Sequence, residues 1–531
     1  MKRNILIGGA WPYANSSLHL GHIAGLISGD VLARYFRLKG DNVLYVSGSD
    51  CHGTPITERA RKEGTEPRVI SEKYNAEFNE LFNKLEFSYD LFSKTDTDFH
   101  KEQVQKLFKK LYDNGFIYEK LEKQAFCTHC NKFLQDRDVV LTCPECGSET
   151  KGDQCDNCLH VPTTEELLTG KCIVCGSSLI ERENKVLYFA LSKFQKDIEA
   201  HTKEVDDNWR VNAKNETWKY LKQGLKDRAV SRDLNWGVEI PLPGYEDKRL
   251  YVWIDAVLGY LTDTMKLSEE RGFNWRDFWK EGHNNLIYMC HGKDNIVFHS
   301  IILNALLLGQ QENYKLVDMI VSAEYLNFND QKFSKSKGIG MTALEALDKY
   351  DADSLRYHLI ANGPEKKDTN FTIEDFENIH DGELLNKFGN LVNRTLNFRG
   401  LDKIEKGTMN PRIETEIRNT YKEAGELIEK LEFRAASERI LKLVEETNKY
   451  YDSEEPWNSK KNNPTKFRDT IYTCATAIAN LGILFYPITP AACEKICKYL
   501  NIKDLKWEYR EVVPNLTLNK IEPLFVRFKN K

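Results

Sequence analysis

Two histidines and a glycine stand within four residues near the start of this chain, in the phrase His19-Leu20-Gly21-His22. The apolar run Ile5-Leu6-Ile7-Gly8-Gly9 precedes them and predicts a strand that ends in a loop, from which a helix begins. The N-terminus of a helix presents free N–H groups and partial positive charge, which hold phosphate groups well. His19 and His22 add donors for the charge that develops on a phosphate in a transition state.

A second phrase with chemical potential is Lys332-Phe333-Ser334-Lys335-Ser336-Lys337-Gly338. Its two leading lysines lie three residues apart among small serines and before a glycine. This pattern is typical of a mobile cationic loop that can clamp a triphosphate and release pyrophosphate. A lysine–serine run alone is more often a solvated loop. The two phrases together, in this order and on an α/β fold, indicate an adenylation site.

Eight of the 13 cysteines form four C-x-x-C pairs within a short segment. These cysteines are Cys127, Cys130, Cys143, Cys146, Cys155, Cys158, Cys172 and Cys175. In a reducing cytosol such pairs indicate metal more often than disulfides, and each supplies half of a tetrahedral zinc site. We expect two structural Cys₄ zinc sites, with thiol-redox and iron–sulfur chemistry as alternatives. The four pairs can combine in three ways, and the spacing does not choose among them.

The bulk composition limits the remaining possibilities. A chain of 531 residues is too long for one core, so we expect three or more domains. The net charge of -5 argues against a uniformly basic surface, although not against a local basic face. No apolar stretch is long enough for a membrane helix, and the N-terminus lacks the apolar segment of a signal peptide. We therefore expect a cytoplasmic protein.

The elements that must position these phrases follow from the order of apolar runs. Strands are predicted at residues 43–46, 249–254 and 285–290, and strand–loop–helix alternation indicates a parallel sheet with ligands at the carboxyl ends of its strands. From about residue 384 apolar residues recur at helical spacing, which predicts a helix bundle. The expected fold is α/β: a doubly wound Rossmann-type parallel sheet, split by a zinc-knuckle insertion and followed by an α-helical bundle. The expected domains are 1–117 and 231–325 for the two halves of the sheet, 118–230 for the insertion, 326–383 for a region with the K-F-S-K-S loop, which the resemblance given below implies is a stem-contact region, and 384–531 for the helical domain.

The two phrases resemble the H-x-G-H and K-M-S-K-S signatures of class I aminoacyl-tRNA synthetases, with Phe333 in place of the usual methionine. The resemblance implies that His19 and His22 stabilise the phosphates of ATP during attack. It implies that Lys332 and Lys335 hold pyrophosphate in the transition state, with Ser334 and Ser336 beside them. Gly21 matches the family glycine, whose missing side chain lets the nucleoside lie close. Gly292-Lys293-Asp294 resembles a family phrase that lies near ATP, which implies that Asp294 is a ribose ligand. Without the resemblance, Lys293 and Asp294 would be interpreted as a surface ion pair.

Further phrases resemble the methionyl-tRNA synthetase family: Pro12-Tyr13-Ala14-Asn15, Asp50-Cys51-His52-Gly53-Thr54-Pro55, and Trp253-Ile254-Asp255-Ala256 with Gly259-Tyr260. The resemblance implies a methionine pocket formed by Tyr13, Asp50, Trp253, Ala256, Tyr260 and His299. A polarizable thioether suits aromatic walls, and Asp50 would accept from the ammonium group. Without these flanking phrases, Trp253 and Tyr260 would read as core packing. The sequence departs from the family at Trp11, Val257 and Asn295, where leucine, proline and an aliphatic residue are common.

The resemblance also implies how the other two regions act. It favours a nested cysteine pairing, with Cys143, Cys146, Cys155 and Cys158 around one zinc and Cys127, Cys130, Cys172 and Cys175 around the other. It implies that the insertion guides the acceptor end of tRNA. In the helical domain, Asn390, Arg394 and Trp457 match anticodon-reading positions, where amide and guanidinium groups read base edges and an indole stacks on a base. Taken alone, these residues would more often be a solvated helix face and an interhelical tryptophan.

The resemblance implies a methionine–tRNA ligase that forms methionyl-adenylate from L-methionine and ATP and transfers the methionyl group to tRNA(Met), both initiator and elongator. Zinc and the magnesium that accompanies ATP are the expected metals. A monomer is expected, because the chain ends without an added C-terminal domain. The alternatives are a synthetase for leucine, isoleucine or valine, a nucleotidyltransferase that binds no RNA, and a zinc-knuckle RNA-binding protein with an inactive core. The short insertion, the helix bundle and the intact histidines and lysines argue against them in turn.

Overall fold

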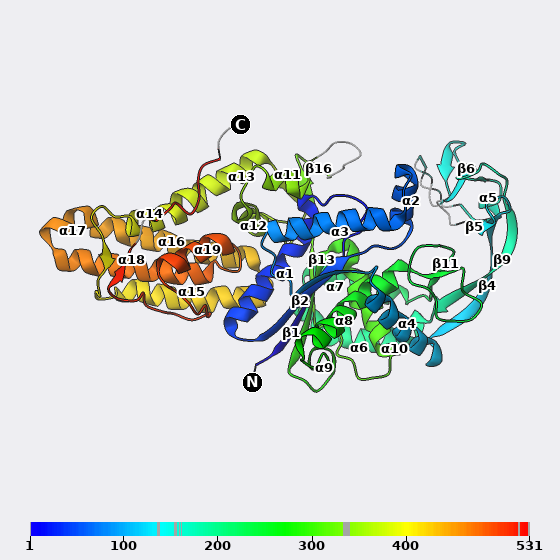
Figure 1. The fold of residues 1–531 in the computed structure, drawn as a ribbon, viewed down its shortest axis with the longest axis horizontal. Helices are drawn as coiled ribbons and strands as arrows, with labels where there is room; N and C mark the ends of the chain where they lie inside the picture. The colour runs from blue at the N-terminus through cyan, green and yellow to red at the C-terminus, as the bar shows by residue number, and fades with distance from the viewer. Residues whose placement is uncertain are drawn as a thin grey trace.

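The computed structural model describes residues 2–134, 138–152, 155, 157–158, 160, 162–332, 340–518 and 521–528, leaving aside the side chains of Thr164 and Lys332. At its centre lies a parallel five-stranded sheet in the order β14-β13-β1-β2-β3 (Figure 1). The strands are β1 (Asn4–Gly9), β2 (Asn42–Ser49), β3 (Leu91–Lys94), β13 (Asn285–Gly292) and β14 (Met319–Ala323). Ile5, Leu6 and Ile7 are fully buried, as expected for a strand covered on both faces.

The strand order reverses between β1 and β13, and this is the point at which doubly wound sheets bind ligands. One half of the sheet runs from β1 through β2 to β3, and the other begins at β13 on the opposite side of β1. The helices that pack on the sheet or follow its strands are α1 (Leu20–Lys39), α2 (Thr54–Glu63), α3 (Pro67–Lys84), α4 (Asp98–Asp113), α8 (Val252–Arg271), α9 (Arg276–Trp279) and α10 (Leu303–Gly309). The predicted doubly wound α/β fold is confirmed.

An insertion separates the two halves of the sheet and lies at one end of the molecule (Figure 1). Its long ribbon pairs β4 (Ile117–Cys127) with β9 (Ile180–Phe189), flanked by β5 (Lys132–Phe133) and β10 (Arg228–Ala229). A smaller sheet, with β6 (Val139–Thr142), β7 (Glu149–Lys151) and β8 (Lys171–Cys172), carries cysteines next to the short helix α5 (Thr164–Leu167). The helices α6 (Gln195–Val205) and α7 (Val211–Gln223) lead back, through β11 (Ser231–Arg232) and β12 (Arg249–Leu250), to the central sheet.

The strand predicted at residues 249–254 is wrong beyond its first two residues. β12 ends at Leu250, and α8 begins at Val252 and continues for 20 residues. The apolar and β-branched residues of this run favoured a strand, but the helix is buried around most of its circumference and so lacks a clear apolar stripe. A short apolar run of this kind does not distinguish a strand from a buried helix. The consequence is functional, because Trp253 and Ala256 lie on the first turns of a helix.

A bundle of helices occupies the end of the molecule opposite the insertion (Figure 1). A small sheet of β15 (Leu326–Phe328), β16 (Gln331–Lys332) and β17 (Thr369–Phe371), with α11 (Ala343–Leu347), α12 (Ala352–Ala361) and α13 (Ile373–Ile379), leads into it. A π-helical segment, His380–Gly389, then continues into the bundle. The bundle comprises α14 (Asn390–Leu396), α15 (Pro411–Glu429), α16 (Phe433–Glu454), α17 (Pro456–Asn462), α18 (Pro464–Leu484) and α19 (Pro490–Tyr499), with β18 (Lys403–Ile404) and β19 (Leu516–Thr517) paired beside it.

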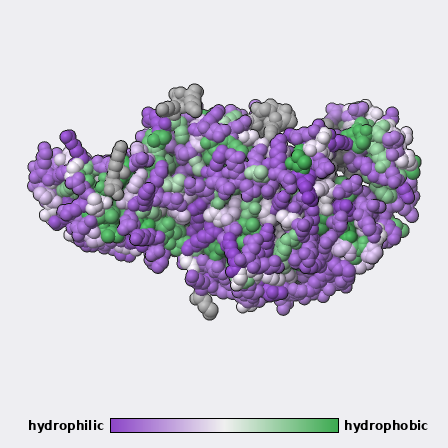
Figure 2. All heavy atoms as spheres, in the orientation of Figure 1, coloured by the Kyte–Doolittle hydropathy of each residue, from purple (hydrophilic) through white to green (hydrophobic). Residues whose placement is uncertain are grey.

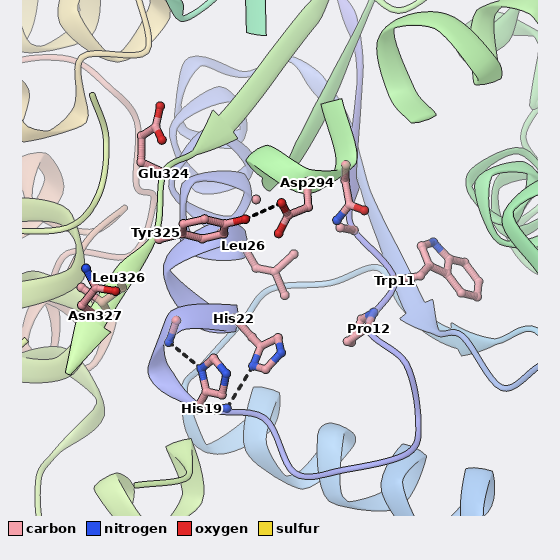
Figure 3. A pocket seen from close by; sticks show the side chains of 15 residues that line it. Trp11, Pro12, His19, His22, Leu26, Asp294, Glu324, Tyr325, Leu326 and Asn327 are labelled. Atoms are coloured by element: carbon pink, nitrogen blue, oxygen red, sulfur yellow. Dashed lines mark hydrogen bonds between the residues drawn. The ribbon is translucent and has the colours of Figure 1, made fainter. Parts of the chain in front are cut away.

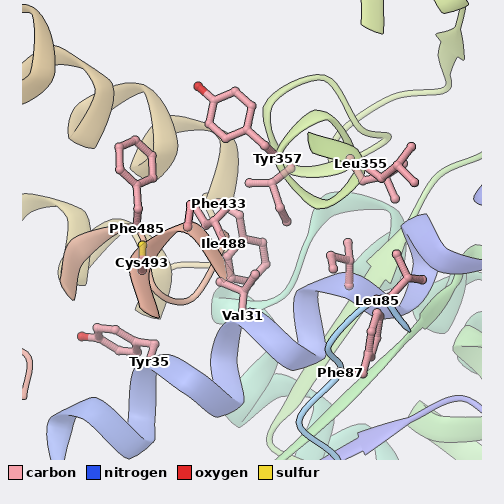
Figure 4. Packing of buried hydrophobic residues seen from close by; sticks show 14 of the residues in the cluster. Val31, Tyr35, Leu85, Phe87, Leu355, Tyr357, Phe433, Phe485, Ile488 and Cys493 are labelled. Atoms are coloured by element: carbon pink, nitrogen blue, oxygen red, sulfur yellow. The ribbon is translucent and has the colours of Figure 1, made fainter. Parts of the chain in front are cut away.

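The sheet and the bundle share one continuous hydrophobic core, to which α1 contributes Val31 and Tyr35 (Figure 4). At this junction Arg356 of α12 is fully buried and donates to Asp30 of α1 at 2.6 Å. It also donates to the carbonyl oxygens of Leu85, Pro487 and Ile488 at 2.9–3.1 Å. The face shown in Figure 2 is mostly hydrophilic, and none of the described helices is long and apolar enough to cross a membrane.

Candidate functional site

The first turn of α1 is built by the two histidines that the sequence singles out. His19 is the N-cap, and its Nδ1 accepts from the backbone N–H of Gly21 at 3.1 Å. Nδ1 of His22 accepts from the backbone N–H of His19 at 3.2 Å, so that the pair forms a capping box with ring centroids 3.8 Å apart. A histidine at each capping position uses Nδ1 for the helix. The proton of each neutral ring therefore lies on Nε2.

Both imidazoles are neutral at physiological pH. Desolvation by the surrounding protein, together with the neighbouring His22, lowers the pKa of His19 to about 3, and desolvation lowers that of His22, which keeps an exposed part, to about 4. Each ring thus offers one neutral N–H donor without carrying a resident charge. Such preorganised donors can stabilise charge that develops on a phosphate.

These histidines border a cavity of about 340 Å³ at the switch point of the sheet (Figure 3). Its wall contains Gly21 and Gly25 of α1, where a Cβ on Gly25 would come within 3.1 Å of the backbone nitrogen of Gly292. Asp294 lines the cavity and accepts from the Tyr325 hydroxyl at 2.5 Å. The other lining residues are Ala10, Trp11, Pro12, His19, His22, Leu26, Gly292, Asn295, Glu324, Tyr325, Leu326 and Asn327.

The residues that line this cavity differ from the sequence-based expectation in two respects. Lys293 is absent from its wall and instead bonds to Glu324 at 2.7 Å and to Asp368 at 2.8 Å. Sequence reasoning missed Glu324 and Tyr325, which line the cavity directly after β14. The available signal was their place after a buried strand, because parallel strands present ligands at their carboxyl ends.

A second cavity of about 400 Å³ adjoins the first, and all six residues of the expected methionine pocket line it: Tyr13, Asp50, Trp253, Ala256, Tyr260 and His299. The two cavities share Ala10, Trp11, Pro12, His22, Asp294 and Asn295 as wall residues. The two cavities are therefore neighbours, and His22 lies at the border between them.

One side of the second cavity is formed by aromatic side chains and carries no net charge. Tyr260 donates its hydroxyl proton to Nε2 of His299 at 2.8 Å, because His299 uses its Nδ1–H for the Asn295 carbonyl at 2.8 Å. Burial lowers the pKa of His299 to about 4, which keeps this pair neutral. Trp253 stacks on Phe298 with 3.7 Å between ring centroids. Such walls suit an uncharged, polarizable side chain.

Trp11, one of the departures from the family, is held in a narrow slot. A Cβ on Gly48 or on Gly259 would come within 2.5 Å of its ring carbons, so only glycine fits at these two positions. The indole lies edge-on to Tyr260, with 6.2 Å between centroids. The larger side chain is thus accommodated by the two glycines. Val257 and Asn295, the other departures, also line the second cavity.

The opposite side of this cavity is acidic. Asp50 follows β2 directly and is almost fully buried, and its backbone bonds to that of Pro12 and Ala14 at 2.8 Å. Burial, followed by the charge of Asp255, raises the pKa of the Asp50 carboxyl well above its ordinary value. A cationic group in the cavity would find its counter-ion here.

The K-F-S-K-S phrase begins beside this site. Lys332 ends β16, whereas Ser334, Lys335 and Ser336 lie outside the described residues. Farther along the chain, Thr342 pairs with His19, and the N–H of Ala343 donates to the carbonyl of Leu18 at 2.8 Å. Thr342 and Ala343 are thus held against the loop that precedes α1.

The cysteines of the insertion gather into two groups of four, in the nested arrangement that the resemblance favoured. Sγ–Sγ distances are 3.4 Å for Cys127–Cys175, 3.9 Å for Cys130–Cys172, and 3.6 Å for both Cys143–Cys158 and Cys146–Cys155. Four thiolates at about 2.3 Å from a tetrahedral zinc ion would lie about 3.8 Å apart. The donor type and the spacing both fit zinc.

The three residues expected to read the anticodon lie close together at the far end of the bundle. Asn390 is exposed at the start of α14, and Arg394 follows one turn later. Arg394 donates to Asp452 at 2.7 Å and lies over the ring of Tyr451. Trp457, which is half-exposed, has its ring centroid 6.3 Å from that of the same tyrosine. The buried ring of Tyr451 therefore supports both the guanidinium and the indole from below.

Comparisons with known proteins agree with this architecture. Residues 5–396 match the family described as tRNA synthetases class I (M), and residues 402–522 match the anticodon binding domain of methionyl tRNA ligase. The fold, the switch-point site and the first match define a class I tRNA synthetase.

Curated relatives narrow this class further. Methionine–tRNA ligase 1 of Alkaliphilus oremlandii (strain OhILAs) is 46% identical over 531 residues, covering 99% of this chain and 98% of the relative. Methionine–tRNA ligase of Bacillus mycoides (strain KBAB4) is 44% identical over 535 residues, with 99% and 97% covered. The chain belongs to the methionyl-tRNA synthetase family. A solved structure of the Mycobacterium tuberculosis methionyl-tRNA synthetase in complex with methionyl-adenylate shares the fold, with a TM-score of 0.81 at 23% identity over 99% of this chain and 100% of that one.

Proposed function

We propose that the two adjoining cavities carry the two reactants of methionine activation, with ATP in the 340 Å³ cavity and L-methionine in the 400 Å³ cavity. The observation that carries this assignment is the shared wall, which contains His22. The methionine carboxylate attacks the α-phosphate in line, which yields methionyl-adenylate and pyrophosphate. The 3′-terminal hydroxyl of tRNA(Met) then attacks the acyl carbon and releases AMP.

No side chain acts as a nucleophile in this scheme, because the reactants supply both attacking groups. His19 and His22 donate from Nε2 to the phosphate oxygens as charge develops on them. Lys332 and Lys335, with Ser334 and Ser336, hold the departing pyrophosphate, and Gly21 and Asp294 border the nucleoside. We assign Lys293 a supporting role, because its bonds to Glu324 and Asp368 keep it out of the wall. Magnesium enters with ATP.

In the second cavity Asp50 accepts from the substrate ammonium group, and the aromatic wall of Tyr13, Trp253 and Tyr260, with His299 and Ala256, surrounds the thioether. Holding both reactants in adjacent sites turns a bimolecular reaction into an effectively unimolecular one. The neutral Tyr260–His299 pair supports an uncharged side chain rather than a charged one.

The insertion and the bundle act on tRNA. Two structural zinc ions, one held by Cys127, Cys130, Cys172 and Cys175 and one by Cys143, Cys146, Cys155 and Cys158, fix the insertion that guides the acceptor end. Asn390, Arg394 and Trp457 read the anticodon. We place the domain boundaries between these functional parts at 117/118, 230/231, 325/326 and 383/384. The proposed setting is the cytoplasm, with the protein as a monomer.

Replacing Asp50 by asparagine tests this assignment, because the amide keeps the size of the side chain but not its charge. We expect the KM for methionine to rise by about 100-fold or more in pyrophosphate exchange, with the KM for ATP within threefold of wild type. Loss of a charge-assisted partner of this kind costs about 3 kcal/mol, which corresponds to this factor. An equal rise in both KM values would contradict the division into two cavities.

A further inference from the structure

Beneath the acidic wall of the second cavity lies a buried ion pair that the proposed scheme does not use. His52 follows Asp50 by two residues, and its Nδ1 lies 2.6 Å from Oδ2 of Asp255. Both side chains are almost completely buried. Asp255 belongs to the first turn of α8, the helix that supplies Trp253, Ala256 and Tyr260 to the cavity. The pair therefore connects the loop after β2 with the helix that forms the opposite wall.

His52 carries a positive charge in this setting. Burial opposes the charged imidazole, but the hydrogen bond and charge of Asp255, with contributions from Asp96 and Asp50, raise the pKa of His52 to about 9. This favourable charge is fully present below the ordinary histidine pKa of about 6.5 and is lost as the pH rises through about 9. At neutral pH, His52 and Asp255 together contribute no net charge.

The groups around His52 come from several elements. Asp96, before α4, lies 3.9 Å from its Nε2 and is itself paired with Lys101 of α4 and with Arg68 of α3. His100 of α4 is neutral, because burial lowers its pKa to about 3. Trp236 packs edge-on against the imidazole, with 5.7 Å between centroids. Asp96 thus has Lys101 and Arg68 beside it as well as His52, whereas the shorter contact of His52 is the one to Asp255.

Both members of the His52–Asp255 pair act on the Asp50 carboxyl group. The backbone N–H of His52 donates to Oδ1 of Asp50 at 3.2 Å. The charge of Asp255 raises the pKa of Asp50, second only to burial, whereas the charge of His52 lowers it. If Asp255 lacked its cation, two buried like charges would repel each other, and one carboxylate would hold a proton more tightly. An Asp50 that holds a proton is a poor acceptor for an ammonium group.

We propose that His52 is a positioning residue for amino-acid activation: through its ion pair with Asp255 it offsets part of the like charge beside Asp50 and so favours the ionised Asp50 that receives the ammonium group of the substrate. This inference rests on the proposed role of Asp50. It adds a second layer of residues to the ammonium site. It also gives a reason for an acidic residue at position 255, which is not among the residues that line the cavity.

The test is the pH dependence of the KM for methionine in pyrophosphate exchange. As the pH falls, KM rises once Asp50 takes up its proton, and the pH at which KM has doubled measures that event. His52→Asn keeps an amide N–H near the position of Nδ1 but removes the charge. We expect the doubling point to move up by about one pH unit or more, with kcat at high pH within threefold of wild type.

The double variant His52→Asn/Asp255→Asn removes one positive and one negative charge, and so we expect the doubling point to return to within about 0.5 pH units of wild type. His100→Asn is the matched control, since it changes a neighbouring buried but neutral histidine, and we expect no movement. A KM raised equally at every pH by His52→Asn, or a double variant no closer to wild type than the single one, would overturn the proposal.

Two further results keep the outcome unambiguous. If His52→Asn does not fold, the ring nitrogens of His52 can be followed by NMR in the wild-type protein, where a neutral imidazole at pH 7 contradicts the proposal. Failure of the proposed function has a different signature, because Asp50→Asn would then leave the KM for methionine unchanged. An affected Asp50→Asn with an unmoved His52→Asn profile rejects only the positioning role.

Discussion

At the scale of single residues, the site combines neutral donors with one buried acceptor. In both His19 and His22, Nδ1 accepts a hydrogen bond from the backbone at the first turn of α1, so the ring proton lies on Nε2. Asp50 is the acidic residue among those that line the second cavity, apart from Asp294, which is shared with the first. The division of labour is electrostatic: phosphate oxygens meet N–H donors, and the ammonium group meets a carboxylate.

The histidine pair yields a prediction about rate rather than binding. Replacing His22 by alanine removes a preorganised donor, and we expect kcat for pyrophosphate exchange to fall by about 10²–10³. The KM for methionine should stay within threefold. Because the two pKa values are about 3 and about 4, neither histidine should impose a titration on the rate between pH 6 and 8.

His283→Ala is a suitable control, since that exposed histidine lies before β13, at the opposite edge of the sheet. It should leave kcat unchanged. A rate that falls with an apparent pKa near 6.5 in the wild type, and loses this dependence in His22→Ala, would contradict neutral donors.

At the scale of elements, α1 links chemistry to architecture. Its N-terminus carries the histidines, and its C-terminal half packs into the core shared with the bundle, where the Tyr35 hydroxyl donates to Glu429 at 2.7 Å. Trp507 donates its backbone N–H to Leu38 at 2.9 Å. A helix of 20 residues is about 30 Å long and rigid on that scale. Displacement of the bundle would therefore move the N-terminus of α1 and, with it, His19.

Arg356 at the junction gives a stability prediction. Arg356→Met leaves Asp30 with one cation instead of two and three carbonyl oxygens without their donor. Removing one member of a buried pair costs about 3–5 kcal/mol of unfolding free energy. Denaturant titration measures this loss. The exposed Arg412→Met is the matched control and should change little; comparable losses for both would show that the junction is not special.

The insertion gives a prediction about metal. Purified protein should contain two zinc ions per chain. Cys143→Ser should reduce that number to one, because it leaves the other site intact, which consists of Cys127, Cys130, Cys172 and Cys175. Since neither cavity is lined by a residue of the insertion, we expect aminoacylation to fall more than tenfold and pyrophosphate exchange less than threefold. Elemental analysis with parallel assays tests both. An equal loss in the two assays would argue against a role limited to tRNA.

The sequence predicted these elements unevenly, for physical reasons. The strand before His19 and the helix after it were visible because glycine, capping residues and apolar spacing are local signals. The helix that begins at Val252 was mistaken for a strand, since burial on all sides erases its periodicity. Glu324 and Tyr325 were missed because only the order of strands in space brings them to the cavity. The cysteine pairing was left open by spacing and needed the fold.

At the scale of the whole molecule, the catalytic sheet stands between two structures that the chemistry itself does not require. The insertion lies at one end and the bundle at the other (Figure 1). This arrangement suits an elongated substrate such as tRNA, which must be recognised far from where it reacts. The surface in view is largely hydrophilic (Figure 2).

Trp457 tests recognition at a distance. Trp457→Ala removes a half-exposed indole, and loss of base stacking costs about 1–3 kcal/mol. We expect kcat/KM for tRNA to fall by about 5- to 100-fold, with methionine-dependent pyrophosphate exchange unchanged. Tyr112→Ala, at an exposed tyrosine on α4, serves as the control. A parallel loss of exchange would place Trp457 in the fold rather than at the anticodon.

The central claim is that the second cavity selects methionine for adenylation, and pyrophosphate exchange measured with each of the 20 amino acids tests it most directly. The predicted result is exchange that depends on methionine, with leucine, isoleucine and valine lower in kcat/KM by at least 100-fold. Exchange with leucine equal to that with methionine would contradict the account.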